Sequence, residues 1–373
     1  MPTWRRRLGR SARGVGFGVV GLLVLEYLVL PQLAGARESL HLLARVNVAY
    51  LLGGVALEGG AIVCYAELTR SLLPKESRPH LFDVLRMNMT TLAVSHLVPG
   101  GTAAGTSLGY RLLTTNGVPG PDAGFALATQ GIGSAVVLNV LLWIGLLVSI
   151  PTRGFNPVYL TAAIVGAVLL AFFGALIFLL TRGEDRAASI LRAIACKIPL
   201  LDEAKVEQVL RRLAARLDEL AADRRLLRRA VLWALANWAL DAASLWVFVA
   251  AFGYRILPDG LIVAFGLANV LAAIPLTPGG LGVVEAVLTS SLVGFGAPRG
   301  VAILGVISYR LVNFWLPIPL GGLGYVSLQY DKSVDRRRAA AELRRLAQEA
   351  RQEVGTASEA GSDDPIKSTK LSQ

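Results

Sequence analysis

The sequence predicts an all-α integral membrane protein with about six full spans and two interrupted, re-entrant helical hairpins, up to eight or more membrane-embedded helices in all. Of its 373 residues, 54% are hydrophobic and only 17% are charged, and the mean hydropathy is +0.56. A soluble chain is usually about 25% charged. Several apolar stretches exceed the roughly 20 residues that cross a bilayer core. They are continuous rather than alternating, which excludes a β-barrel.

The hydropathy pattern places the spans along the chain. Full spans are expected near residues 15–33, 47–70, 121–150, 157–181, 230–253 and 300–329, and interrupted segments at 80–116 and 259–296. The expected domains are a basic N-terminus (1–14), a membrane domain (15–330), a charged helix (331–354) and a disordered tail (355–373). An uncleaved first span is favoured over a signal peptide, because its apolar stretch is long and contains Glu26.

Residues 182–229 are polar, with apolar positions at helical spacing. This pattern predicts an amphipathic helix on the bilayer surface, with a partner-binding coiled coil as the alternative.

The net charge of +11 indicates orientation rather than nucleic-acid binding, because the basic residues lie between the apolar spans. Lys and Arg concentrate before residue 15, after the second span, in 182–229 and after residue 330. They all fall on one side only if each interrupted segment enters and leaves by the same face. We therefore expect a plasma-membrane protein with both termini in the cytoplasm.

An internal repeat relates the two interrupted segments. Residues 92–123 and 271–302 align without gaps at an offset of 179, with ten of 32 positions identical, including a shared Pro-Gly-Gly. Three full spans separate the copies, which inverts the second copy relative to the first. The repeat halves, around 80–150 and 259–330, are thus expected to form an inverted-topology repeat, as in many transporters.

Each Pro-Gly-Gly is expected at the tip of a hairpin. Proline ends one half-helix and the glycines allow the reversal. Such backbone survives at membrane depth only where it is buried in protein or lines a wet cavity. The unpaired amides of the second half-helix would favour an anion. The alternative is a pair of surface turns that join full spans.

Ionisable side chains within apolar segments are functional candidates by default. The substrate-binding candidates are Arg111, Glu285, Arg310, Asp241, Tyr309 and His96, and the hairpin-tip residues are Pro99, Gly100, Gly101, Pro278, Gly279 and Gly280. Glu58, in "LEGGA", is expected to face the protein interior.

Each charged candidate also has a purely structural interpretation. Glu285 and Arg310 can form a mutual ion pair, Asp241 can make a helix-packing hydrogen bond, and His96 can cap a half-helix. The repeat mates of Glu285 and Arg310 are Thr106 and Gly131. The scaffold is duplicated and the charges are not, which favours a dedicated task for them.

No nucleotide loop, nucleophile triad or metal cluster is visible in the sequence, and the two cysteines, Cys64 and Cys196, imply no disulfide. No cofactor, metal or nucleic-acid partner is expected.

The second repeat, "IPLTPGGLGVVEAVLTSSLVGFG" followed by "ISYRLVNFWLPIPLGGLGY", resembles the flippase-like transmembrane region of lysylphosphatidylglycerol synthases, which also occurs as a stand-alone protein. The resemblance covers roughly residues 10–330. It implies movement or handling of lipids rather than aminoacyl transfer, because no soluble aminoacyltransferase domain follows the last span.

The favoured function is therefore a transporter or flippase for an anionic phospholipid or a polyprenyl-phosphate-linked head group. The alternatives are a membrane glycosyl- or phosphotransferase that uses Glu285 as a base, and an accessory subunit of a lipid-modifying system. A homo-oligomer or a separate synthase partner is compatible with each.

Orientation is testable by cysteine labelling of Ser189→Cys and Ser358→Cys in intact cells. An impermeant reagent should fail to label either site, because both are expected in the cytoplasm. Ready labelling of either site from outside would overturn the orientation.

Overall fold

The computed structural model describes residues 47–98, 101–153, 157–182, 223–272 and 277–331, and every regular element in these ranges is a helix. The predicted first span, residues 183–222 of the predicted surface helix, and the chain after residue 331 lie outside the described residues. So do Glu26, Cys196, Pro99 and Gly100.

Four of the described helices are long and apolar enough to cross a membrane. They are Val48–Leu72 (α3), Gly120–Pro151 within α6 (Gly120–Arg153), Arg224–Ala251 (α10) and Arg299–Asp331, which begins with α13 (Arg299–Arg310). They coincide with four of the predicted spans, and α7 (Pro157–Arg182) occupies the range of a fifth. The chain is thus a multi-pass helical membrane protein. Helix α10 starts six residues earlier than expected, where the Asp223 carboxylate accepts bonds from the Arg225 and Leu226 amides.

Each interrupted segment is a pair of short helices. The first consists of α4 (Leu81–Leu97) and α5 (Gly101–Thr114), and the second of α11 (Pro258–Ala272), the 3-10 turn η3 (Pro278–Gly280) and α12 (Val283–Gly294). Helices of 12 to 17 residues rise only about 18–26 Å, less than the roughly 30 Å bilayer core. In both segments the two helices pack against each other.

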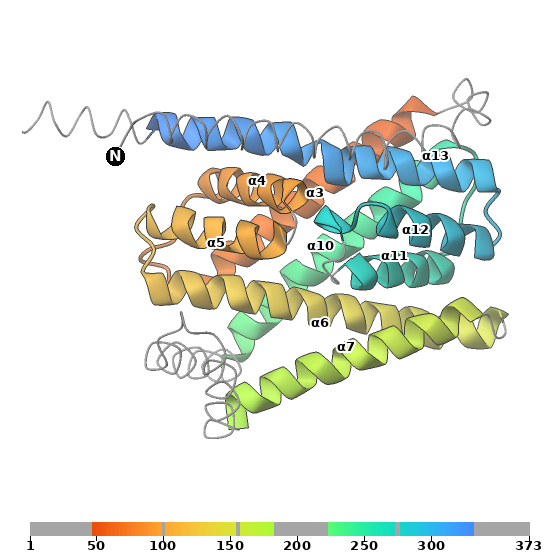
Figure 1. Ribbon diagram of the computed structural model, residues 1–373, viewed down its shortest axis with the longest axis horizontal. Helices are drawn as coiled ribbons and strands as arrows, with labels where there is room; N and C mark the ends of the chain where they lie inside the picture. The colour runs from red at the N-terminus through yellow and green to blue at the C-terminus, as the bar shows by residue number, and fades with distance from the viewer. Residues whose placement is uncertain (1–46, 99–100, 154–156, 183–222, 273–276, 332–373) are drawn as a thin grey trace, which may run out of the picture. The chain divides into compact units, whose positions relative to one another are not determined.

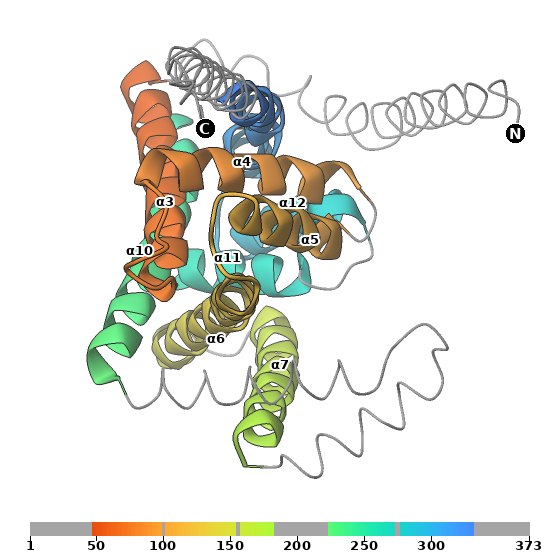
Figure 2. The same cartoon turned by 90° about the vertical axis from the view of Figure 1, so that its left-hand side faces the viewer.

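The two hairpins approach each other from opposite ends of the bundle (Figure 1). The view in Figure 2 agrees, with α4 and α5 in front of α11 and α12. Both α4 and α5 contact η3. At Gly279 a Cβ atom would lie 3.1 Å from Cδ2 of His96, which is near the end of α4. The tip region of one hairpin therefore meets the tip of the other.

The outer ends of the two hairpins lie with different helix ends. One pocket brings together the end of α3 (Leu72), the start of α6 (Asp122) and the start of α10 (Arg225). Hairpin α4–α5 connects the first two of these ends, so it leaves and returns on this side.

Three hydrogen bonds link helix ends on the opposite side of the bundle from this pocket. The Asn47 amide donates to Ala251 O at the end of α10 (3.2 Å), and the Tyr254 hydroxyl donates to Phe295 O after α12 (3.4 Å). Ser149 Oγ, in the last turns of α6, donates to Asp259 Oδ2 in the first turn of α11 (3.2 Å). The outer ends of α11 and α12 therefore lie with the start of α3 and the ends of α6 and α10.

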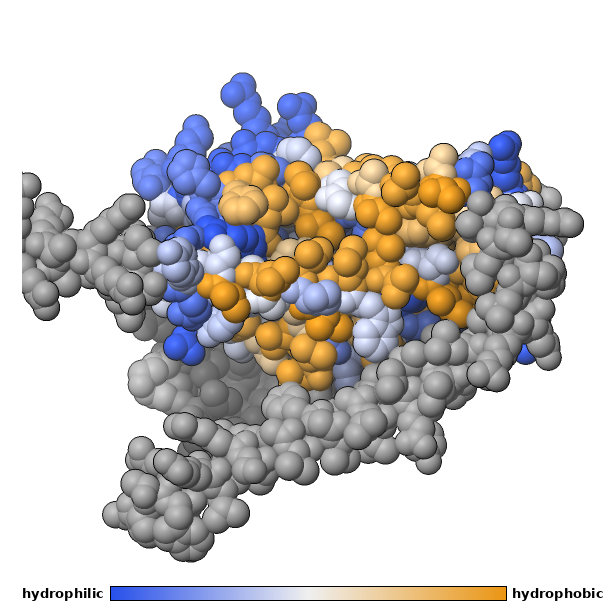
Figure 3. Space-filling model, turned by 90° about the horizontal axis from the view of Figure 1, so that it is seen from above, coloured by the Kyte–Doolittle hydropathy of each residue, from blue (hydrophilic) through white to orange (hydrophobic). Residues whose placement is uncertain are grey.

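The face of the bundle that Figure 3 shows is apolar between more polar ends. On α6 the exposed side chains include Ile144, Leu147 and Val148, and on α7 they include Ile164 and Val168. Exposed apolar surface of this extent is expected where a protein faces lipid tails rather than water.

Both hairpins end in the same backbone motif. The amide of Val118 donates to Leu113 O and that of Gly117 to Thr114 O, and the equivalent bonds run from Ala297 to Leu292 and from Gly296 to Val293. This is a Schellman motif, with glycine at φ +88° and +95°. The shared glycines of the sequence repeat thus perform the same task in both copies.

The first hairpin offers a stability test at Gly105, where α5 approaches α4. A Cβ atom there would lie 2.0 Å from Ser95 Oγ and 2.8 Å from the carbonyl oxygen of Thr91. Because the Thr91 backbone cannot yield easily, Gly105→Ala should cost about 1–3 kcal/mol and lower the thermal unfolding midpoint of the purified protein.

Gly133→Ala in α6 is the matched control, because a Cβ atom there meets nothing within 4 Å. It should be neutral or stabilise by up to about 1 kcal/mol. Equal midpoints for the two variants would contradict the close packing of α4 on α5.

Candidate functional site

A buried ion pair lies at the tip of the second hairpin. Arg310 Nε donates to Glu285 Oε1 at 2.6 Å, and each residue is only 6% exposed. The two side chains come from the end of α13 and the start of α12. The structure therefore contains the ion pair that the sequence left as one of two interpretations.

The local backbone explains why Glu285 points to this place. It is the third residue of α12, and its Oε2 accepts from the Gly282 amide at the helix start at 2.7 Å. A carboxylate in the first turn also interacts favourably with the helix dipole. The N-terminus of α12 was expected to offer free amides to an anion, and Glu285 instead occupies one of them.

Arg310 makes two further contacts around its guanidinium group. Nη2 donates to the carbonyl oxygen of Gly279 at 3.3 Å, and Cζ lies 4.4 Å from the centre of the Phe314 ring. No described residue accepts from Nη1. Nη1 is therefore available to a further acceptor.

A π-helical turn, η4 (Leu311–Trp315), follows Arg310 directly and carries Asn313 and Phe314. Such turns are rare in proteins, and those that occur are often found at functional sites. It places the Phe314 ring under the Arg310 guanidinium group. It also points the Asn313 side chain toward α3 and α10.

His96 joins the first hairpin to this site. Its ring stacks on Phe314 at 4.2 Å between centroids, and Nδ1 lies 2.9 Å from the Phe314 carbonyl oxygen. A carbonyl oxygen only accepts, so Nδ1 carries the proton in this bond. Phe314 is thus covered on one side by His96 and contacted by Arg310.

Two buried carboxylates form a second cluster beside the ion pair. Asn313 Nδ2 donates to Glu58 Oε1 at 2.7 Å and to Asp241 Oδ1 at 3.4 Å, and the Tyr309 hydroxyl donates to Asp241 Oδ1 at 2.7 Å. Glu58 is 4% exposed and Asp241 7%. Glu58 Oε2 is buried and has no hydrogen-bond donor among the described residues.

The acceptor atoms of these carboxylates share one nitrogen, so they lie no more than about 6 Å apart, and carboxylates this close repel when both are ionised. The cluster can therefore accept a proton or the cationic part of a ligand. In the described part of the chain, no group of three or more His, Cys, Asp or Glu side chains is arranged to hold a metal ion.

Five of the six substrate-binding candidates thus come together, namely Glu285, Arg310, Asp241, Tyr309 and His96. Arg111 does not join them. It is exposed in the last turn of α5, ten residues or about 15 Å along the helix from Gly101 at the tip. Of the other tip residues, Gly101 begins α5 and is buried, whereas Pro278, Gly279 and Gly280 form η3.

Asn313 and Phe314 were not among the site residues predicted from the sequence. The available signal for Asn313 was an uncharged polar residue in an apolar span, three positions after Arg310. Glu58 was expected to face the interior, and its position beside Asp241 agrees.

The fold and this site define a polytopic helical membrane protein in which two broken helices meet around buried charges. The chain belongs to the family described as "Lysylphosphatidylglycerol synthase TM region", which matches residues 15–321.

Its relatives are also membrane proteins. A UPF0104 membrane protein of Methanothermobacter thermautotrophicus is 24% identical over 327 residues, covering 84% of this chain and 94% of its own length. The UPF0104 membrane protein PH1989 of Pyrococcus horikoshii is 27% identical over 104 residues, or 28% of this chain and 31% of its own. The inner membrane protein YbhN of Escherichia coli is 27% identical over 93 residues, or 25% and 28%.

The ion pair generates a stability prediction. Glu285→Gln and Arg310→Gln should each destabilise the protein by about 3–5 kcal/mol, because each leaves a buried charge without its partner. The double variant should recover most of this loss. Thermal unfolding of the purified variants measures it.

Arg299→Gln is the control, since Arg299 is exposed at the start of the same helix, and its effect should stay within about 0.5 kcal/mol. A double variant no more stable than either single variant would show that the two charges do not depend on each other.

Proposed function

We propose that the protein carries an anionic phospholipid, or a polyprenyl-phosphate-linked head group, between the two leaflets of the membrane. The observation that carries the proposal is Arg310, a buried cation with an unoccupied Nη1 at the place where the two hairpins meet. Buried charges in spans commonly mark the path of a substrate.

The depth of the site supports transport rather than surface binding. Arg310 is eleven residues from the start of α13 and Glu285 nine residues from the end of α12. These separations correspond to about 17 Å and 14 Å along the helices, roughly half of a bilayer core of about 30 Å. A head group bound here would be midway between the leaflets.

The chemistry of the site fits a head group that carries phosphate. Arg310 offers a planar fork that can bind phosphate oxygens in a bidentate manner. Glu285 orients this fork, and a phosphate would compete with it for the guanidinium group. Glu58 and Asp241 supply negative charge on the other side of Tyr309 and Asn313, where a cationic part of the head group would fit.

We further propose that the halves around residues 80–150 and 259–330 form an inverted-topology repeat, which would let the site open alternately to each side. Three observations support it: the outer ends of the hairpins lie with opposite sets of helix ends, the tip regions meet, and the same Schellman motif closes both hairpins. In this proposal the protein is in the plasma membrane with cytoplasmic termini.

The family description adds support for a lipid substrate, because lysylphosphatidylglycerol is an aminoacylated phospholipid. This lipid carries a phosphate, which matches the cationic Arg310, and amino groups, which match the carboxylates of Glu58 and Asp241. The particular head group is left open by this match, because any lipid that combines the two charges would satisfy it.

Leaflet exchange of labelled anionic lipid in vesicles tests the proposed function. The wild-type protein should accelerate exchange, and the Glu285→Gln/Arg310→Gln double variant should be stable but inactive, because it lacks a fixed positive charge for the phosphate. Arg310→Lys should be at least about tenfold slower, the equivalent of one lost charge-assisted hydrogen bond. Arg299→Gln should match the wild type.

Two outcomes would contradict this function. A stable and fully active double variant would show that Glu285 and Arg310 only hold the helices together. Chemical conversion of the lipid, read by mass spectrometry of the same vesicles, would favour the membrane-enzyme alternative.

A further inference from the structure

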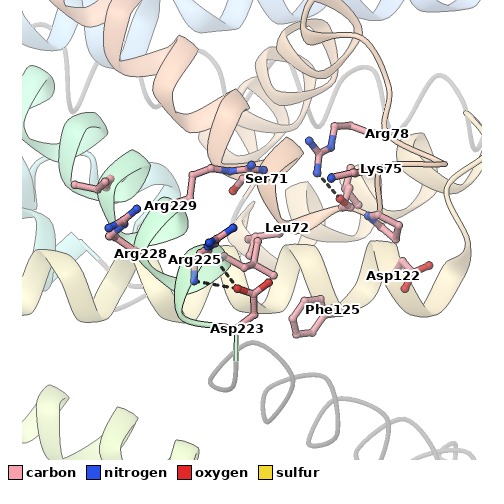
Figure 4. A pocket seen from close by; sticks show the side chains of 14 residues that line it. Ser71, Leu72, Lys75, Arg78, Asp122, Phe125, Asp223, Arg225, Arg228 and Arg229 are labelled. Atoms are coloured by element: carbon pink, nitrogen blue, oxygen red, sulfur yellow. Dashed lines mark hydrogen bonds between the residues drawn. The ribbon is translucent and has the colours of Figure 1, made fainter.

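A second charged region lies far along the helices from Arg310. It is a pocket of about 720 Å³ at the joint ends of α3, α6 and α10 (Figure 4). Five cationic side chains line it, namely Lys75, Arg78, Arg225, Arg228 and Arg229, against the two carboxylates of Asp122 and Asp223. The Asp223 carboxylate already accepts bonds from two amides at the start of α10. The lining thus has an excess of positive charge.

Arg78 is the most enclosed of these cations. Its Nη2 donates to the Leu73 carbonyl oxygen at 2.8 Å, whereas its Nε is buried and has no hydrogen-bond partner among the described residues. Burial lowers the pKa of Arg78, and the positive charges of Arg229 and Arg70 lower it further. Arginine stays charged all the same, so the pocket holds cations that repel each other and that an anion would stabilise.

The pocket also has an apolar side. Leu72, Leu73, Phe125, Leu226 and Leu232 line it as well. A free phosphate ion would use only the cations, whereas a phospholipid would place its phosphate among them and the first carbons of its chains against these apolar side chains. The location fits as well, because the ends of the membrane helices lie at the level of the head groups.

We propose that this basic pocket binds the phosphate of an anionic phospholipid head group at the membrane surface, as a site separate from Arg310. The inference goes beyond the proposed function and does not depend on it, since a resident lipid can occupy this pocket whether or not the protein moves lipids.

Binding to nanodiscs or detergent micelles that contain phosphatidylglycerol tests the proposal on the full chain, with phosphatidylcholine alone as the reference. Retained lipid is counted by native mass spectrometry. Arg229→Gln should weaken phosphatidylglycerol binding at least about tenfold, the equivalent of one lost charge-assisted hydrogen bond to the phosphate. Arg224→Gln is the matched control, because it removes the same charge from an exposed neighbour on α10 that does not line the pocket. It should change binding less than about twofold, because Arg224 does not contact the bound phosphate and salt screens its exposed charge.

Arg78→Gln provides a second test, with Arg229→Gln as the safeguard if loss of the bond to Leu73 impairs folding. Equal weakening by Arg224→Gln and Arg229→Gln would mean a diffuse basic surface and would overturn the proposal. So would equal retention of phosphatidylcholine. Competition by inorganic phosphate as strong as that by phosphatidylglycerol would assign the pocket to free phosphate instead of lipid.

Discussion

The arrangement of this site depends on the need to bury one positive and one negative charge together in an apolar interior. Glu285 and Arg310 are each costly there alone. Their contact requires α12 to begin close to the end of α13, and therefore requires the break at Pro278–Gly280 that starts α12 in the interior of the bundle. The same break exposes the Gly279 carbonyl oxygen to Arg310. The position of the hairpin, the capping of α12 and the direction of the arginine are thus parts of one constraint.

The segment from Tyr309 to Phe314 joins this ion pair to the rest of the site. Tyr309 and Asn313 donate to Asp241 and Glu58, which would otherwise be buried carboxylates with fewer donors. The Phe314 ring contacts both the Arg310 guanidinium group and the His96 ring. A single stretch of helix with a π turn therefore connects both hairpins with the long helices α3 and α10. A ligand that moved Arg310 would therefore also change the contacts of these helices.

Two groups of charged side chains among the described residues lie at different depths and in different surroundings. At the ends of α3, α6 and α10 the arginines are mostly exposed and water screens their mutual repulsion, so several can lie side by side around one pocket. In the interior only one arginine is present among the described site residues, and it is paired. If both proposals hold, the pocket would bind an anionic head group at the membrane surface and Arg310 would bind one in the interior.

The sequence by itself determined the helices, their breaks and the duplicated turns, because hydropathy, proline and glycine act on the neighbouring backbone. It also identified Glu285, Arg310, Asp241 and His96, since a charged or titratable side chain in an apolar segment stands out without a partner in view. Only the tertiary structure decided which of these side chains meet. Asn313 reaches Glu58 across 255 positions and His96 reaches Phe314 across 218, while Arg111 faces outward. The direction of a side chain depends on how its helix is rotated about its axis, and packing against distant helices sets that rotation.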